Sequence, residues 1–187
     1  MPEELVVQIH ADESCLGNQF VDRDNPGAGA GLVEYWKDGA WERRDFWLSD
    51  PATTNNRMAL ESATAGLAHL KRACSVVFVS DSQYLVKGMS EWVRGWKARG
   101  WKRKAGPIEN LELWQALDRE AARHRVEWRW VRGHAGHPKN EYANHLATGA
   151  AKRLDASDGL VSSGFDAWLE GERRKKRYLD WVEPGLG

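Results

Sequence analysis

The run SVVFVS at residues 75–80 is the feature that most constrains the fold of this chain. It is almost wholly apolar and rich in β-branched residues, which favours a β-strand. A strand without a polar face has to be covered on both sides, as in sheets that carry helices on both faces. The run therefore predicts a layered α/β domain.

The surrounding segments fit such a domain. An apolar strand is expected over residues 5–11, ending at Asp12, and a fifth strand over residues 126–131. Residues 27–36 and 40–48 predict two strands joined by an Asp-Gly turn. Helices are expected over residues 54–70, 111–123 and 140–154, with a polar-aromatic helical region before Trp101. In the first helix, the spacing of four apolar residues predicts one buried face: Leu60, Ala63, Leu67 and Leu70.

Composition narrows the class of protein. A chain of 187 residues suits one domain with a sizeable core. No run approaches the roughly 20 apolar residues of a membrane helix, and the start does not look like a secretory signal. With only two cysteines, a disulfide framework is not expected and a cytoplasmic location is. The formal net charge is zero, but residues 87–104 hold seven basic side chains and one acid, which leaves nucleic acid as a possible partner.

We divide the chain into three parts. Residues 1–154 hold the predicted domain, residues 155–164 form a Ser/Gly/Asp-rich linker, and residues 165–187 form a basic and aromatic C-terminal extension. The basic cluster at residues 173–177 either adds affinity for phosphate or lies on a solvated helix that is packed by its tryptophans. Residues 19–25 form an insertion in the first hairpin, which we expect to be a solvated loop or a contact with a ligand.

Two aspartates come directly after apolar strands. Asp12 and Asp81 each end such a strand, and ligands bind at the carboxyl edge of α/β sheets. The pair could share a metal ion, because carboxylate oxygens are preferred ligands of hard cations. From spacing alone, both could equally cap turns or helices.

Four sequence blocks then resemble the motifs of type 1 ribonuclease H, in the family's order and spacing. They are DESCLGN at residues 12–18, TTNNRM at residues 53–58, DSQY at residues 81–84, and WVRGHAGHP followed by Asn140 and Glu141. The resemblance extends from about Leu5 to Arg153. It implies a five-stranded mixed sheet flanked by helices. It also implies endonucleolytic cleavage of the RNA strand of an RNA–DNA hybrid by four acids and two Mg²⁺ ions, for which Mn²⁺ can substitute.

Only two of the four acids can be carried over. Asp12 and Asp81 match the first and third acids, whereas Ala59 and Asn144 stand at the second and fourth positions. Glu61 lies about 200° around the helix from residue 59 and is expected to point away. Asn144 retains a neutral oxygen ligand, so the predicted metal ligands are Asp12, Asp81 and Asn144. We therefore expect severely impaired hydrolysis with retained hybrid binding, whether the two changes are natural or engineered.

Two further observations concern the site. Glu13 replaces the small residue usual after the first aspartate, and strand alternation predicts that its side chain points to the other side. By resemblance, His134 is a mobile base or proton shuttle, although a histidine in such a loop can also be a solvated surface group. His137 and His145 lack the partners of a zinc site.

The resemblance also implies how a hybrid would be held. Tyr84, Trp92 and Trp96 would line a channel for the DNA strand, although the two tryptophans could instead face the core. Thr54 and Asn110 would bind a DNA phosphate, and three amides would reach the minor groove. The full set of predicted binding residues is Asn18, Thr54, Asn55, Asn56, Gln83, Tyr84, Trp92, Trp96, Lys97, Arg99, Lys102 and Asn110.

Three classes of function remain to be separated. The first is a monomeric hybrid ribonuclease with impaired activity. The second is a module that binds hybrids without cutting them. The third is a transposase-like or resolvase-like member of the same superfamily that acts on DNA, which the tryptophan-rich segment and the TTNN motif disfavour.

Overall fold

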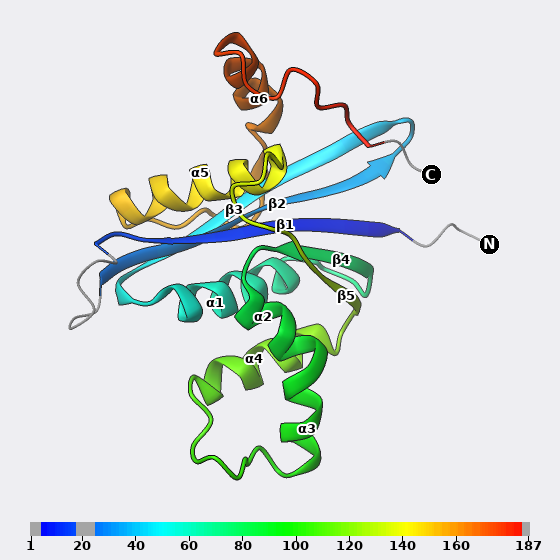
Figure 1. The fold of residues 1–187 in the computed structure, drawn as a ribbon. Helices are drawn as coiled ribbons and strands as arrows, with labels where there is room; N and C mark the ends of the chain where they lie inside the picture. The colour runs from blue at the N-terminus through cyan, green and yellow to red at the C-terminus, as the bar shows by residue number, and fades with distance from the viewer. Residues whose placement is uncertain (1–4, 18–24, 185–187) are drawn as a thin grey trace.

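A computed structural model describes residues 5–17 and 25–184 of the chain. Its centre is a mixed sheet in the order β5-β4-β1-β2-β3-β6 (Figure 1). The strands are β1 (Val6–Cys15), β2 (Asn25–Lys37), β3 (Ala40–Thr53), β4 (Ser75–Ser80), β5 (Arg125–Trp130) and β6 (Val161–Ser162). β1 runs parallel to β4 and antiparallel to β2, so the apolar strand β4 lies inside the sheet, between β1 and β5.

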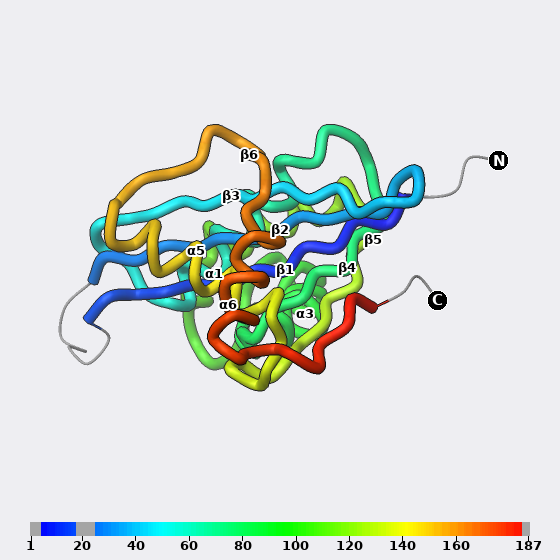
Figure 2. Tube along the Cα trace, turned by 90° about the horizontal axis from the view of Figure 1, so that it is seen from above, coloured from blue at the N-terminus to red at the C-terminus, as the bar shows by residue number. Residues whose placement is uncertain are grey.

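Helices cover both faces of this sheet, as the apolar run at residues 75–80 predicted. On one face lie α1 (Asn55–Ala68), α2 (Gln83–Lys87), a π-helical turn η1 (Gly88–Trp92), α3 (Val93–Ala98) and α4 (Leu111–Ala121). The opposite face carries α5 (Pro138–Arg153), with α6 (Phe165–Arg174) beyond it. Seen from above, β3, β2, β1 and β4 follow one another beneath α5 and α6 (Figure 2).

The main core lies between the sheet and the α1 layer. The four residues predicted for the buried face of the first helix, Leu60, Ala63, Leu67 and Leu70, are all buried there. Thr54 caps this helix, accepting a hydrogen bond at its Oγ1 from the backbone N–H of Arg57 at 3.3 Å. The capping and periodicity signals in the sequence thus gave the correct start and face of α1.

The mixed α/β fold is confirmed, with three differences in detail. The described sheet has six strands rather than five, because the two-residue β6 pairs with β3 at Arg44 and Asp45. β1 continues beyond Asp12 to Cys15, since its pairing with β2 extends to Gly27. The helical region before Trp101 is divided by η1, where Gly88 lies against Trp114 and a Cβ would come within 1.9 Å of its ring.

The C-terminal part of the chain packs on the rest of the protein. Within residues 155–164, Asp155 accepts a hydrogen bond from Trp47 Nε1 at 2.9 Å, and Ser157 Oγ accepts one from Trp47 N at 3.1 Å. α6 contributes Phe165 and Leu169 to a second apolar cluster. The boundaries at residues 154 and 164 stay a prediction. None of the helices in the described part of the chain has both the length and the apolar character to cross a membrane.

Candidate active site

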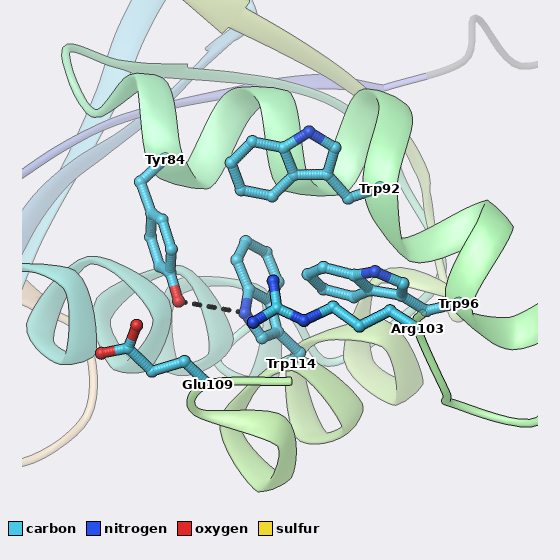
Figure 3. A pocket seen from close by; sticks show the side chains of 6 residues that line it. All are labelled: Tyr84, Trp92, Trp96, Arg103, Glu109 and Trp114. Atoms are coloured by element: carbon cyan, nitrogen blue, oxygen red, sulfur yellow. Dashed lines mark hydrogen bonds between the residues drawn. The ribbon is translucent and has the colours of Figure 1, made fainter. Parts of the chain in front are cut away.

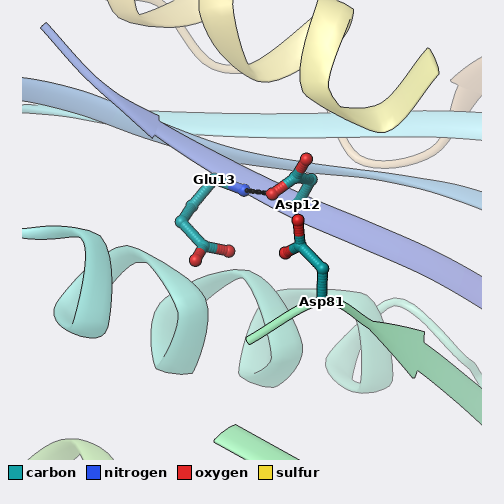
Figure 4. Close-up of side chains that lie close together, drawn as sticks. All are labelled: Asp12, Glu13 and Asp81. Atoms are coloured by element: carbon teal, nitrogen blue, oxygen red, sulfur yellow. Dashed lines mark hydrogen bonds between the residues drawn. The ribbon is translucent and has the colours of Figure 1, made fainter. Parts of the chain in front are cut away.

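Asp12 and Asp81 lie side by side where β4 ends beside β1. In the parallel register Ala11 of β1 pairs with Ser80, the last residue of β4, so Asp12 continues along β1 and Asp81 directly follows β4. Figure 4 shows their carboxylates facing each other. The structure therefore brings together the two acids that strand ends in the sequence had suggested.

Glu13 adds a third carboxylate to this pair. One carboxylate oxygen from each of Asp12, Glu13 and Asp81 lies within 4.8 Å of the other two. Strand alternation is kept, since Glu13 and Asp12 leave β1 on opposite sides (Figure 4). The expected direction of the Glu13 side chain therefore agrees with the structure, and on that side its carboxylate lies near those of Asp81 and Asp12.

The side from which Glu13 enters is the side of α1. Glu13 pairs with Gly29 of β2, and paired residues point to the same face of a sheet. A Cβ at Gly29 would lie 2.5 Å from the Cβ of Ser62 in α1, so this face is the one α1 covers. Glu13 therefore approaches the aspartates from the face on which the helix with Ala59 is packed.

Ala59 itself is part of the apolar core. It is 1% exposed and belongs to the cluster that contains Ala11 and Leu60. Glu61 does not join the three carboxylates; its Oε1 lies 4.0 Å from Arg57 Nη2. The prediction that Glu61 cannot stand in for an acid at position 59 agrees with this placement.

The electrostatics of the three carboxylates are unfavourable without a cation. Burial and the neighbouring charge of Asp81 raise the pKa of Asp12 to about 8. Burial, followed by the charges of Asp12 and Asp81, holds the pKa of Glu13 well above its usual value, and burial raises that of Asp81. In the part of the chain that is described, no lysine or arginine forms an ion pair with them. Clustered carboxylate oxygens of this kind suit Mg²⁺ or Mn²⁺.

Asn144 reaches the cluster from the other face of the sheet. It lies on α5, and its side-chain amide favours the ionised form of the Asp12 carboxylate, lowering the pKa of that group against the effect of burial. Thr148, one helical turn later, donates to Ser14 Oγ at 3.2 Å and fixes α5 against β1. The site is thus assembled around β1 from both faces of the sheet, with Glu13 on the face that α1 covers and Asn144 on the face that α5 covers.

The loop before α5 closes on Asp81. A Cβ at Gly133 would lie 2.4 Å from Asp81 Oδ2, so a larger residue here would displace the Asp81 carboxylate. His134 follows, with its side chain 77% exposed and its Nδ1 3.1 Å from Glu141 Oε1. The sequence reasoning gave Glu141 no role, although an acid in the first turn of the last helix was a signal for one. His137 precedes α5, and the His145 ring stacks on Tyr142.

A second candidate region is an aromatic pocket of about 330 Å³ (Figure 3). Its lining side chains are Tyr84, Trp92, Trp96, Arg103, Glu109 and Trp114. Trp96 is only 9% exposed, so it serves the core and lines the pocket at once. The Tyr84 hydroxyl accepts hydrogen bonds from Trp114 Nε1 at 3.1 Å and Asn110 Nδ2 at 3.2 Å. Trp114 lines this pocket as well but was not among the residues predicted for this region.

Several other predicted binding residues lie at the start of α1. Arg57 links Thr54 to Asn110, since its backbone N–H donates to Thr54 and its Nη1 donates to Asn110 Oδ1 at 3.1 Å. Asn55, Asn56 and Gln83 are exposed. Asn18 and residues 19–24 of the insertion lie outside the described residues.

Three basic side chains beside the pocket are already engaged. Lys97 pairs with Asp118 at 3.0 Å, Arg99 donates to the carbonyl of Lys102, and Arg103 donates to the carbonyl of Pro107. These are exposed contacts, which contribute little to stability and can be exchanged for contacts with phosphate.

Comparison with known proteins identifies the class to which this fold and site belong. Residues 4–152 match the family model of RNase H. A ribonuclease H from Pseudomonas paraeruginosa is 46% identical over 156 residues, which cover 82% of this chain and 99% of the relative. A ribonuclease HI from Pseudomonas aeruginosa is 45% identical over 156 residues, which again cover 82% of this chain and 99% of the relative. The chain belongs to the ribonuclease H family, whose members are nucleic-acid-binding hydrolases.

Solved structures agree. The chain resembles LC9-RNase H1, described as a type 1 RNase H with the type 2 active-site motif, at a TM-score of 0.88 and 48% identity. That match covers 98% of this chain and 89% of the other. The PFV RNase H domain shares the fold alone, at a TM-score of 0.68 and 16% identity. The resemblance to type 1 ribonuclease H that the motifs suggested is therefore confirmed.

Proposed function

We propose that this chain is an endoribonuclease that cleaves the RNA strand of RNA–DNA hybrids and uses Asp12, Glu13 and Asp81 to hold its divalent cations. The observation that carries the proposal is the cluster of three carboxylates within 4.8 Å, none of them paired with lysine or arginine in the described chain. Its donor set is all oxygen, which fits Mg²⁺, with Mn²⁺ as an alternative. Bound cations would supply Lewis-acid stabilisation of the scissile phosphate and lower the pKa of water.

The residues around the cluster have separate tasks in this proposal. Asn144 favours the ionised form of the Asp12 carboxylate through its side-chain amide and offers a neutral oxygen of its own. His134 exchanges a proton with water or product at Nε2, because its Nδ1 faces Glu141 Oε1. The close approach of Gly133 to Asp81 keeps the start of this loop beside the metal ligands.

The hybrid would lie across the site, with its DNA strand toward the aromatic pocket. Tyr84, Trp92 and Trp96 present ring faces and edges to sugars and bases there. Thr54 and Asn110, joined through Arg57, suit a DNA phosphate. The exposed amides of Asn56 and Gln83, together with Asn18, would reach the minor groove, where contacts need not select a sequence.

Glu13 changes the expectation for activity. The prediction of severe impairment assumed that Ala59 removes a carboxylate without replacement. Because Glu13 brings one from the same α1 side, we propose a functional site whose acid has moved from helix to strand. Ala59 and Asn144 still favour a second candidate, a protein that binds hybrids without cutting them. Restoring both acids, by Ala59→Glu with Asn144→Asp, separates the two candidates.

The test is cleavage of three matched substrates by the full chain in Mg²⁺: an RNA–DNA hybrid, an RNA duplex and a DNA duplex. We expect cutting of the RNA strand of the hybrid alone, loss of cutting in Asp81→Asn, and little gain from restoring the two acids. A silent wild-type chain that becomes active on restoration would instead identify the non-catalytic binder. Cutting of duplex DNA would point to a DNA-acting member of the superfamily. We further propose a monomer that works in the cytoplasm.

A further inference from the structure

The C-terminal extension meets the catalytic part of the protein at Lys139, near the start of α5. Figure 1 shows the chain after α6 running toward the turn that joins β2 and β3. There Glu183 Oε1 lies 2.7 Å from Lys139 Nζ, and Glu183 Oε2 lies 2.8 Å from Arg43 Nη2. The family match ends at residue 152, so Glu183 lies outside the part of the chain that the family model describes.

Lys139 is held on several sides. Its side chain is 8% exposed, and its Nζ also donates to Glu34 Oε1 at 2.5 Å. The ammonium lies over two indole rings, 5.0 Å from the centroid of Trp41 and 5.7 Å from that of Trp181. A buried lysine is stable as a cation only when its charge is matched by acids and aromatic faces. Two of these four contacts, Glu183 and Trp181, come from the extension.

The charge balance around Lys139 depends on Glu183. Arg43 donates to Glu34 at 2.8 Å, so Lys139 and Arg43 share one fully buried acid. Burial lowers the pKa of the adjacent His10, which favours its neutral form. With Glu34 alone, two cations would face one anion, and Glu183 restores equality by contacting both cations. Asp166 of α6 adds a more exposed contact to Arg43.

The position of Lys139 in the chain links this network to the catalytic loop. Lys139 lies five residues after His134 and in the same first turn as Glu141, which contacts His134. The tail also shares a cavity of about 250 Å³ with the end of that loop, since Trp181 and Pro184 line it together with His137, Pro138 and Lys139. The rest of α5 is fixed separately, by Tyr142 to Asp45 and by Thr148 to Ser14.

We propose that Glu183 is a positioning residue for the proposed reaction. Acting through Lys139, it holds the first turn of α5, and with it the loop that carries His134, in the catalytic arrangement. The inference rests on the proposed function for its kinetic consequence. Its structural part, the ordering of the loop by the extension, stands independently. Because Tyr142 and Thr148 fix the later turns of α5, removal of Glu183 loosens the loop and leaves the fold intact.

The test compares Glu183→Gln with Glu170→Gln in the full chain. Glu170 is an exposed acid on α6 that pairs only with Arg174 in the described structure, so it controls for charge loss in the extension. Hydrogen exchange of the amides at residues 131–138 should become about tenfold faster in Glu183→Gln and stay unchanged in Glu170→Gln. On a hybrid substrate, kcat should fall roughly tenfold in Glu183→Gln, with KM within about twofold.

A double-mutant cycle tests the route through Lys139. In a Lys139→Met background, Glu183→Gln should have no further effect on loop exchange or kcat. Equal loop exchange in wild type and Glu183→Gln would overturn the inference, and so would additive effects in the cycle. If Lys139→Met fails to fold, the comparison with Glu170→Gln decides alone. A wild-type chain that cleaves nothing, but whose loop loosens in Glu183→Gln, would contradict the proposed function and support the positioning role.

Discussion

Two buried acids on neighbouring strands, Asp12 of β1 and Glu34 of β2, belong to groups with opposite electrostatics. In the β1–β2 register, Asp12 pairs with Ala30 and Gln8 with Glu34, so the groups are four residues apart, or about 13 Å. The pKa of Asp12 is raised to about 8 by burial and by Asp81. Burial acts on Glu34 in the same direction, but hydrogen bonding to His10 and the charge of Lys139 lower its pKa to about 2.

The difference shows that burial alone does not decide what an acid does. Glu34 has Arg43 and Lys139 at hydrogen-bond distance and contributes to the structure. Asp12, Glu13 and Asp81 have one another and no such cations among the described residues, so a metal ion would be their missing counter-charge. Glu34 and its partners should therefore stabilise the metal-free protein, whereas the cluster of Asp12, Glu13 and Asp81 should destabilise it.

The largest effect should come from breaking the compensated group. Glu34→Gln leaves Lys139 and Arg43 with Glu183 as their shared acid, and breaking a buried ion pair costs about 3–5 kcal/mol of unfolding free energy. Urea denaturation measures this loss. Glu170→Gln, which breaks an exposed pair, should change the same quantity by less than about 1 kcal/mol. Equal losses in the two variants would remove the distinction between compensated and exposed acids.

The pH dependence of stability should differ in sign between the groups. The folded-state pKa of Asp12, about 8, lies above its ordinary value of 3.8, so the folded protein binds more protons between these values. In chelator, stability should therefore fall by about 3–4 kcal/mol as the pH rises from about 5 to 8, and Asp12→Asn should abolish this component. Glu34, with its lowered pKa, contributes stability above its ordinary value of 4.5 that is lost as the pH falls toward about 2.

The pH prediction is checked by urea denaturation of wild type and Asp12→Asn at several pH values. If the unfolding free energy of Asp12→Asn falls between about pH 5 and 8 as steeply as that of the wild type, Asp12 does not cause this pH dependence.

A smaller effect is expected from the metal itself. Mg²⁺ at about ten times its dissociation constant should stabilise the wild-type chain by about 1.4 kcal/mol, because it binds the folded state alone. Glu13→Gln should lose most of this Mg²⁺-dependent stabilisation, whereas Glu34→Gln should keep it. Thermal unfolding with and without Mg²⁺ gives the measurement. A Mg²⁺ response in Glu13→Gln as large as in wild type would exclude Glu13 from the metal site.

Much of the fold was predictable because local signals agreed with one another. The apolar strand at residues 75–80 required cover on both faces, and the spacing of Leu60, Ala63 and Leu67 indicated which side of α1 is buried. Asp12 and Asp81 followed from the same pattern, since the ends of parallel strands meet at one edge of the sheet. The short strand β6 was not predictable, because two residues carry no periodicity.

The role of Glu13 was missed for a physical reason. Alternation along a strand predicts the direction of a side chain, but not which other side chains its carboxylate comes near. The available signal was a pair of substitutions, an acid at 13 where a small residue is usual and Ala59 where an acid is usual. The contacts of Glu183 were hidden differently, since 44 residues of sequence separate it from Lys139 and no periodicity links the two.

The most direct test of the metal site is the rate of RNA-strand cleavage in Glu13→Gln beside Glu61→Gln. Both changes remove one carboxylate near α1, but only Glu13 lies in the cluster with Asp12 and Asp81. Loss of a metal ligand weakens transition-state stabilisation by several kcal/mol, so Glu13→Gln should lower kcat about 100-fold or more in saturating Mg²⁺. Glu61→Gln should stay within about twofold of wild type. Cleavage by Glu13→Gln at the wild-type rate would contradict the assignment of the third carboxylate.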